Sequence, residues 1–206
     1  MSPASVVGEM LVWLTRLVTG VQVRWAGCDP DERQRLYYAN HTSHLDTMVI
    51  WSALPRHLRS RTSPVAAEDY WAKNALRRFL AKDVFHAVLI KRGGVNAGRE
   101  ALTRISEALG QGTSVIFFPE GTRGDGATVG AMKAGLYHIA KDHPGLELVP
   151  VYLQNLNRIL PKGEILPVPL LGTATFGAPL PHMSDETREG FLERAKASLV
   201  ELGSIK

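Results

Sequence analysis

The first group of side chains that could do chemistry lies in one short segment, residues 40 to 46. Its histidine, His41, is followed five positions later by a carboxylate, Asp46. A histidine can accept a proton near neutral pH, and a neighbouring carboxylate can hold its ring in the required tautomer. The pair could therefore remove a proton from a bound hydroxyl group, with His41 as the base and Asp46 as its orienting partner.

His41 and Asp46 can meet only where the chain changes conformation. On one straight helix, five residues correspond to about 500° of rotation, so the two side chains would diverge. The apolar run at residues 36–39 predicts a strand before the segment, and residues 44–54 predict a helix after it. We therefore expect His41 on a loop and Asp46 in the first turn of that helix.

Two other interpretations of this segment compete with catalysis. Ser43 and Asp46 have the spacing of a capping box, in which side chains bind the free N–H groups at a helix start. His41, His44 and Asp46 also suggest a metal site, but hydrolases of the lactamase type have a further histidine where this chain has Thr47. The spacing disfavours the metal, whereas a capping role for Asp46 stays open.

A second loop with functional groups follows an apolar strand expected at residues 85–90. Arg92 lies just after this strand and precedes two glycines, which let a ligand approach the backbone. An arginine at a strand end is also common as a solvated surface charge. This loop therefore indicates a binding site only in combination with others.

A third loop, at residues 119–124, follows a strand expected at residues 115–118. Arg123 can bind a phosphate with two hydrogen bonds, and Thr122 and the backbone amides can add donors. Glu120 could orient an arginine or a substrate hydroxyl. Sites of open parallel sheets form where strand ends meet loops, so the three loops predict one site with a base and phosphate-binding groups.

The chain offers no obvious nucleophile of its own. No serine occupies a Gly-x-Ser-x-Gly turn, and Cys28 has no histidine near it in the sequence. A covalent acyl-enzyme would need such a nucleophile beside a base, so we expect the His–Asp pair to act directly on a bound substrate. A single cysteine also excludes an internal disulfide and a multi-cysteine metal site, and it favours a reducing compartment.

The elements that must position these loops alternate between strands and helices. Strands are expected at residues 21–25, 36–39, 63–67, 85–90, 115–118 and 146–153, with one or two more within 165–176. Helices are expected at residues 4–23, 44–54, 69–80, 97–109, 132–141 and 184–202, with Asn96 and Ser184 as caps of the fourth and the last. This alternation predicts an α/β fold, a single domain with a mostly parallel central sheet flanked by helices.

The amino-acid composition and net charge limit the kinds of binding partner that can be expected. Among 206 residues, 45% are apolar, and 24 basic against 20 acidic residues give a net charge of +4. This charge is too small to indicate nucleic acid by itself, but it is compatible with anionic lipid surfaces or phosphate-bearing substrates. Glu9 and Arg16 interrupt the apolar N-terminal stretch, so we expect neither a secretory signal nor a membrane-spanning helix.

The N-terminal helix at residues 4–23 is amphipathic. Trp13 and Trp25 are of the residue type that favours a membrane interface. The helix could pack on the domain, anchor at the surface of a membrane, or do both. We therefore divide the chain into a membrane-association helix at residues 1–25 and a domain at residues 26–206 that carries the three loops.

Four segments together resemble the motifs of the 1-acylglycerol-3-phosphate acyltransferase (lysophosphatidic acid acyltransferase) family of glycerolipid acyltransferases. In chain order they are Asn40-His41-Thr42-Ser43-His44-Leu45-Asp46 with its His-x4-Asp motif, Val88-Leu89-Ile90-Lys91-Arg92, Phe118-Pro119-Glu120-Gly121-Thr122-Arg123 and Val149-Pro150-Val151. The third segment is specific, and the ordered set, which spans residues 40 to 151, is more so. Two residues depart from the second motif: His86 and Lys91 stand where the family often has Gly and Asp.

The resemblance implies a glycerolipid acyltransferase fold and a role for each matching residue. His41 would be the general base on the acceptor hydroxyl, Asp46 its orienter, and Asn40 and Ser43 positioning residues. The acceptor's glycerol phosphate would be bound by Arg92, Glu120, Gly121, Thr122 and Arg123. Pro150 would shape the side of the site that takes the acyl donor.

The resemblance also implies the reaction and its partners. A fatty acyl chain would pass from a thioester of CoA or acyl carrier protein to the free hydroxyl of a lysophospholipid, first of all 1-acylglycerol-3-phosphate, giving phosphatidic acid. Neither a metal nor another cofactor is expected, because a thioester is already activated. The enzyme would work as a peripheral or monotopic protein on the cytoplasmic face of the cell membrane. The alternatives are a different lysolipid acceptor, or a non-catalytic lipid- or phosphate-binding protein on the same scaffold.

Overall fold

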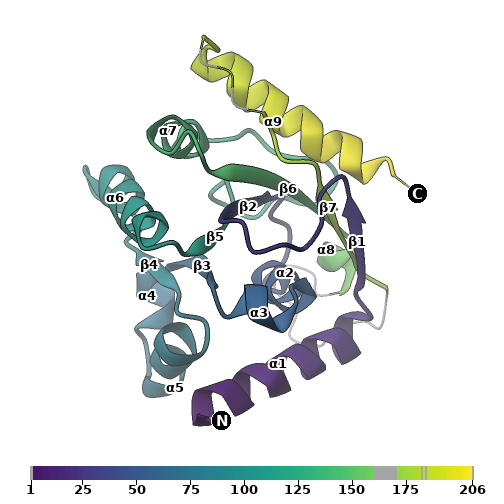
Figure 1. Ribbon diagram of the computed structural model, residues 1–206. Coiled ribbons are helices and arrows are strands. Elements are labelled where there is room, and N and C mark those ends of the chain that lie inside the picture. The colour runs from purple at the N-terminus through teal and green to yellow at the C-terminus, as the bar shows by residue number, and fades with distance from the viewer. Residues whose placement is uncertain (1, 160–170, 182, 184, 206) are drawn as a thin grey trace.

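The computed structural model describes residues 2–159, 171–181, 183 and 185–205, and one central sheet runs through them (Figure 1). Within this part of the chain seven strands pair in the order β1-β7-β6-β2-β5-β3-β4. Their bounds are β1 (Gln22–Ala26), β2 (Arg35–Ala39), β3 (Thr62–Ala67), β4 (Val88–Ile90), β5 (Ser114–Phe117), β6 (Glu147–Gln154) and β7 (Thr173–Gly177). All neighbouring pairs are parallel except β6 and β7. The predicted α/β class with a mostly parallel sheet is therefore confirmed.

Strand β2 forms the centre of the sheet, and all five of its residues are buried. Tyr37 lies opposite Ile116 of β5 and Val149 of β6. Alternate residues of a strand point to opposite faces, so Leu36 and Tyr38 join one hydrophobic cluster while Tyr37 joins the other. A parallel sheet needs such cover on both faces, which is why this strand is apolar throughout.

Helices supply the cover on each face (Figure 1). One face is covered by α1, α2 and α8, and the other by α6, α7 and α9. The helices are α1 (Pro3–Thr19), α2 (Asp46–Ala53), α3 (Arg56–Arg59), α4 (Glu68–Trp71), α5 (Ala75–Phe79), the π-helical η1 (Leu80–Val84), α6 (Ala97–Gly110), α7 (Gly135–Asp142), α8 (Leu156–Ile159) and α9 (Arg188–Gly203).

The single helix expected at residues 69–80 is instead broken into α4 and α5. The side chain of Asn74 accepts a hydrogen bond from the Arg77 N–H at 2.9 Å and so begins a new helix. The strand expected at residues 85–90 is also shorter and begins at Val88. His86 has a φ of +49°, a left-handed conformation that a strand does not contain.

Several predicted helix ends differ from the structure in their caps. Asn96 lies at the N-cap of α6 but makes no capping bond through its side chain. The last helix was expected to begin at Ser184, which lies outside the described residues; α9 begins at Arg188, and Thr187 caps it by accepting the Gly190 N–H at 3.1 Å. Of the strands expected within 165–176, β7 is confirmed, and residues 160–170 are not described.

Helix α1 ends earlier than expected because Gly20 adopts a φ of +51° and closes it. The next residues form β1, which pairs with β7 along its whole length. Residues 22–25, which the sequence assigned to the N-terminal segment, therefore belong structurally to the sheet. The functional division into a membrane-association segment and a catalytic domain stays a prediction.

Candidate active site

Asn40 fixes the point at which the chain leaves β2. Its side-chain amide donates to the Leu153 carbonyl at 2.9 Å, and its carbonyl oxygen accepts the Leu153 N–H at 2.8 Å. The side chain is buried, and its two hydrogen bonds to the Leu153 backbone take the place of a backbone–backbone pair between β2 and β6. The following residue, His41, is thereby held at the carboxyl edge of the sheet.

Asp46 is the first residue of α2, and its buried carboxylate lies beside His41. Its Oδ2 atom is 2.8 Å from Nδ1 of His41 and accepts the N–H groups of Thr42 at 2.6 Å and Ser43 at 2.9 Å. A carboxylate can only accept, so Nδ1 carries the ring proton and Nε2 is left as the basic nitrogen. Asp46 thus binds free N–H groups near the helix start and orients the histidine as well.

The predicted N-cap role of Ser43 is wrong, because Leu45 occupies the N-cap position of α2. The Ser43 hydroxyl accepts a hydrogen bond from the Leu45 N–H at 3.3 Å. Ser43 therefore stabilises the turn that joins His41 to Asp46, which suits the positioning role expected for it.

The third loop holds His41 from its other sides. The His41 ring stacks on Phe118, with ring centroids 4.3 Å apart and an interplanar angle of 23°. Its backbone N–H donates to Oε1 of Glu120 at 2.8 Å, and its carbonyl accepts the Gly124 N–H at 2.8 Å. The two loops therefore converge as predicted, and Phe118 has a positioning role that the sequence did not reveal.

Glu120 has a different place from the one expected. Its second oxygen, Oε2, accepts the Gly130 N–H at 3.1 Å, and the side chain is buried. A Cβ atom on Gly130 would overlap Oε2, so glycine is required opposite the carboxylate. Glu120 therefore joins two loops and positions the backbone of His41, and it does not line the cavity beside the base.

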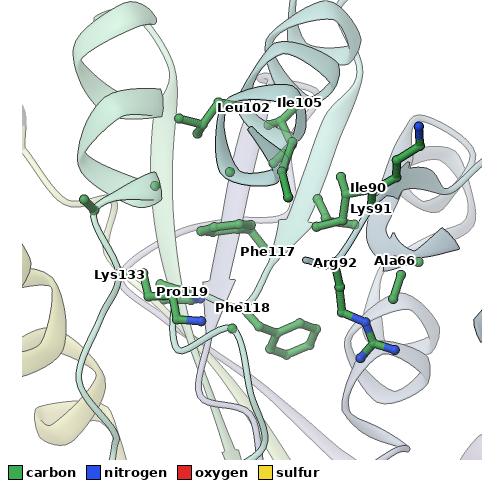
Figure 2. Close-up of a pocket in the computed structure, with 18 of the residues that line it drawn as sticks. Ala66, Ile90, Lys91, Arg92, Leu102, Ile105, Phe117, Phe118, Pro119 and Lys133 are labelled. Atoms are coloured by element: carbon green, nitrogen blue, oxygen red, sulfur yellow. The ribbon is translucent and has the colours of Figure 1, made fainter. Parts of the chain in front are cut away.

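An apolar cavity of about 500 Å³ opens beside His41, between the sheet and helices α6 and α7 (Figure 2). Leu102 and Ile105 lie at one end, and Arg92 and Lys133 lie on opposite sides of Phe118 at the other (Figure 2). The apolar lining comes from Val65, Ala66, Ala67, Ile90, Ala97, Ala101, Leu102, Ile105, Phe117, Phe118 and Pro119. The space suits a hydrocarbon chain whose polar end reaches the histidine.

Arg92 lines this cavity, as the sequence predicted, but its charge is already paired. Its Nε and Nη2 atoms donate to the two carboxylate oxygens of Asp69 at 3.0 and 2.7 Å. The hydrogen bonds with Arg92 lower the pKa of Asp69, and the same contact raises the pKa of Arg92. Asp69 was missed, although its place just after a predicted strand was a usable signal.

The other predicted binding residues divide into two groups. Gly121 lines the cavity with a φ of +69°, a conformation that favours glycine. Thr122 and Arg123 belong to the same loop but do not line the cavity. Pro150 lies opposite Tyr38 inside the sheet and is buried, so the structure does not bring it to the site. A donor-shaping role for Pro150 is not supported by this position.

His44 lies on the outside of the loop and is exposed. Partial desolvation of its ring and the positive charge of Arg123 lower its pKa. The metal interpretation needs His44 together with His41 and Asp46. In the described ranges, no three His, Cys, Asp or Glu side chains are grouped closely enough to hold a metal ion.

The fold and the site together define a class: an α/β protein with a hydrogen-bonded His–Asp pair at the end of an apolar cavity. Comparison with known families agrees with this class. A model of the Acyltransferase family matches residues 21–154, well over half of the sequence. The chain therefore belongs to the Acyltransferase family.

Individual relatives extend this result. Over 135 residues, the chain is 35% identical to a chloroplastic 1-acyl-sn-glycerol-3-phosphate acyltransferase of Arabidopsis thaliana; the match covers 63% of this chain and 34% of that protein. Over 177 residues it is 27% identical to a 1-acyl-sn-glycerol-3-phosphate acyltransferase of Limnanthes alba; the match covers 80% of this chain and 56% of that protein. The chain thus spans about a third of the Arabidopsis protein and just over half of the Limnanthes protein.

A solved structure also resembles the fold. The crystal structure of the 1-acyl-sn-glycerophosphate (LPA) acyltransferase PlsC from Thermotoga maritima aligns with a TM-score of 0.74 and 22% sequence identity. The alignment covers 98% of this chain and 82% of that one. At this identity the likeness shows a shared fold.

Proposed function

We propose that the protein transfers a fatty acyl chain from a thioester to the free hydroxyl of a lysophospholipid, most directly 1-acylglycerol-3-phosphate, giving phosphatidic acid. The observation that carries this proposal is the 2.8 Å contact between His41 Nδ1 and Asp46 Oδ2 at the end of an apolar cavity. Membership of the Acyltransferase family and the names of the relatives support it. The donor is a thioester of CoA or of acyl carrier protein.

The reaction needs only groups that this chain supplies. Asp46 accepts a hydrogen bond from the Nδ1–H group of His41, so Nδ1 keeps its proton and Nε2 of His41 can take the proton of the acceptor hydroxyl. The hydroxyl oxygen forms a bond to the thioester carbonyl carbon, and the carbon–sulfur bond then breaks. The proton passes from His41 to the departing sulfur, which leaves as a free thiol. A thioester is already activated, so we propose that no metal or other cofactor takes part.

The surface of α1 supports a location at a membrane. Helix α1 is held to the domain by Arg16, which donates to the Ser52 carbonyl at 2.6 Å, and by Glu9, which pairs with Arg59 at 2.7 Å. Its outer face leaves large apolar side chains exposed: Val6, Met10, Trp13, Leu14 and Leu17. Such a face can lie in the headgroup region of a bilayer. We therefore propose peripheral or monotopic binding to the cytoplasmic face of the cell membrane.

Across residues 2–159, 171–181, 183 and 185–205, no helix combines the length and apolar character that a membrane span requires.

A thiol-release assay tests the proposed reaction. Palmitoyl-CoA and palmitoyl-acyl carrier protein are each mixed with lysophosphatidate, lysophosphatidylglycerol, lysophosphatidylethanolamine or glycerol 3-phosphate, and both free thiol and the lipid product are measured. We expect thiol and phosphatidic acid to appear in equal amounts with lysophosphatidate. A protein that binds lysophosphatidate yet releases no thiol with either donor would instead be a binding protein on this scaffold.

A further inference from the structure

The cations around the cavity differ in what neutralises them. Arg92 is bound through two hydrogen bonds to Asp69, so that corner of the cavity carries little net charge. Lys133 lines the same cavity and forms no ion pair with any carboxylate of the described residues. Lys91 also contributes to the lining, but its side chain extends away from Phe118 (Figure 2). Lys133 therefore supplies an uncompensated positive charge on the Phe118 side of the cavity.

The loop that positions the base also positions Lys133. The Lys133 N–H donates to the Pro119 carbonyl at 2.9 Å. Its ammonium group lies over Gly121, where an added Cβ atom would be 2.5 Å from Nζ and 3.0 Å from Cε. The absence of a side chain at Gly121 thus leaves the space that the ammonium occupies. The adjacent residue, Glu120, binds the backbone of His41, so one short loop sets both the base and the cation.

We propose that Lys133 binds a substrate phosphate beside His41. A lysine ammonium offers a point charge and three donors, which suit a phosphate dianion. A dianion placed against Arg92 would also meet the carboxylate of Asp69, which repels it. The identity of the phosphate carrier rests on the proposed function: it is either the glycerol phosphate of the acceptor or a phosphate of the thioester donor.

Kinetics of a Lys133→Met variant distinguish these two sources. The acceptor is the soluble 1-hexanoylglycerol 3-phosphate, and the phosphate-free comparison is 1-hexanoylglycerol, each with palmitoyl-CoA. We expect KM for the phosphate acceptor to rise about tenfold or more with kcat nearly unchanged, and KM for the phosphate-free acceptor to stay the same. A rise in KM for palmitoyl-CoA with both acceptors would assign the phosphate to the donor. Unchanged KM values for all three substrates would overturn the proposal.

A matched control is Lys141→Met, which removes an exposed lysine of α7 that does not line this cavity. Its kinetic constants should equal those of the wild type. Lys133 is exposed, so both variants should unfold at the wild-type temperature.

Binding without turnover separates this proposal from the proposed function. Calorimetric titration of the wild type and of Lys133→Met with 1-hexanoylglycerol 3-phosphate and with CoA needs no reaction. If the wild type releases no thiol with any acceptor, the proposed function is wrong, and the titrations still decide about Lys133. Weakening of either ligand by about tenfold in Lys133→Met supports the proposal. Equal binding in both proteins, or no binding to the wild type, contradicts it.

Discussion

Asp46 combines two duties that the sequence presented as alternatives. One oxygen, Oδ2, accepts bonds from His41 Nδ1 and from the backbone N–H groups of Thr42 and Ser43. The capping interpretation and the catalytic one are therefore compatible, because the same carboxylate binds the backbone N–H groups of the turn and fixes the tautomer of the His41 ring.

Replacement of Asp46 by asparagine should separate these duties. The amide oxygen can still accept backbone N–H groups, but the residue no longer carries the charge that stabilises a protonated His41. We expect the rate of acyl transfer to fall roughly 10³-fold, while the free energy of unfolding falls by only about 1–2 kcal/mol. Asp142→Asn, at an exposed position of α7, should match the wild type in both measurements. A loss of stability with full activity would leave Asp46 as a cap alone.

The pKa of His44, in the loop after β2, depends on how close Arg123 of the loop after β5 lies to it. Partial burial and the charge of Arg123 lower it, because both disfavour the protonated ring. In an Arg123→Met variant we expect the His44 pKa to rise toward that of a free histidine, as followed by the pH dependence of its ring proton signals in NMR spectra. The sign follows from removing a positive neighbour. An unchanged pKa would mean that Arg123 lies farther from this loop in solution.

The residues that the sequence missed share one property: they reach the site through tertiary contacts. Asp69 follows β3 and meets Arg92, which follows β4. Lys133 precedes α7 and lies over Gly121. Motif spacing identified His41 and Asp46, because they are close in the chain as well as in space. It could not show which arginine was already paired.

At the scale of the elements, the Glu120 carboxylate ties the loop after β5 to the loop after β2. Its two oxygens accept hydrogen bonds from the backbone N–H groups of His41 and Gly130, and so hold the two backbone segments together. The motif alone does not reveal this structural role. The sequence placed Glu120 correctly in the third loop but oriented it toward the substrate. The Gly130 backbone, which meets the carboxylate from ten residues away, could not be inferred from the motif.

A Glu120→Gln variant should loosen this tie. The amide NH2 group would face one of the two backbone N–H donors, which leaves a buried donor without an acceptor. We expect the free energy of unfolding to fall by about 1–3 kcal/mol and the transfer rate to fall at least about tenfold. Chemical denaturation and the thiol-release assay measure the two effects. Glu107→Gln, exposed on α6, is the control, and equal behaviour of both variants would refute the positioning role.

Element boundaries were predictable where a local signal sets them and failed where competing signals act. The strand that became β2 was predicted to within a residue, because four apolar residues precede a polar loop. The helix expected at residues 69–80 failed because Asn74 starts a new helix inside an otherwise helical pattern. The π-helical turn of η1 and the left-handed His86 shortened β4, and neither has a periodic signature in the sequence.

At the scale of the whole molecule, the mostly parallel sheet was predictable but its order was not. The alternation of strands and helices implies crossover connections, and hence parallel neighbours. The pairing of β1 with β7 joins segments near opposite ends of the chain, and β6 and β7 are antiparallel. No local pattern encodes such long-range pairs. Within the described residues, helix α1 is followed directly by β1, which forms one edge of the sheet.

The outer face of α1 should govern binding to membranes. Trp13 and Leu17 are 75% and 82% exposed, so their replacement removes apolar surface without disturbing the packing of the helix. We expect Trp13→Ser with Leu17→Ser to reduce sedimentation with vesicles that contain phosphatidylglycerol at least about fivefold, at an unchanged unfolding temperature.

The control for this experiment is Val200→Ser on α9, on the opposite side of the molecule from α1 (Figure 1). Val200 is also largely exposed, at 51%, so its loss tests for a general effect of surface apolarity. Vesicle binding of this variant should equal that of the wild type. If the α1 variant binds vesicles as well as the control does, the helix only covers the sheet.

The role of His41 as general base is tested by the rate of thiol release in a His41→Ala variant, with lysophosphatidate and palmitoyl-CoA as substrates. His57→Ala, exposed on α3, serves as the control. We expect His41→Ala to reduce kcat by at least about 10³-fold while lysophosphatidate still binds and the protein remains folded, and His57→Ala to keep the wild-type rate. Transfer by a folded His41→Ala protein at the wild-type rate would contradict the mechanism.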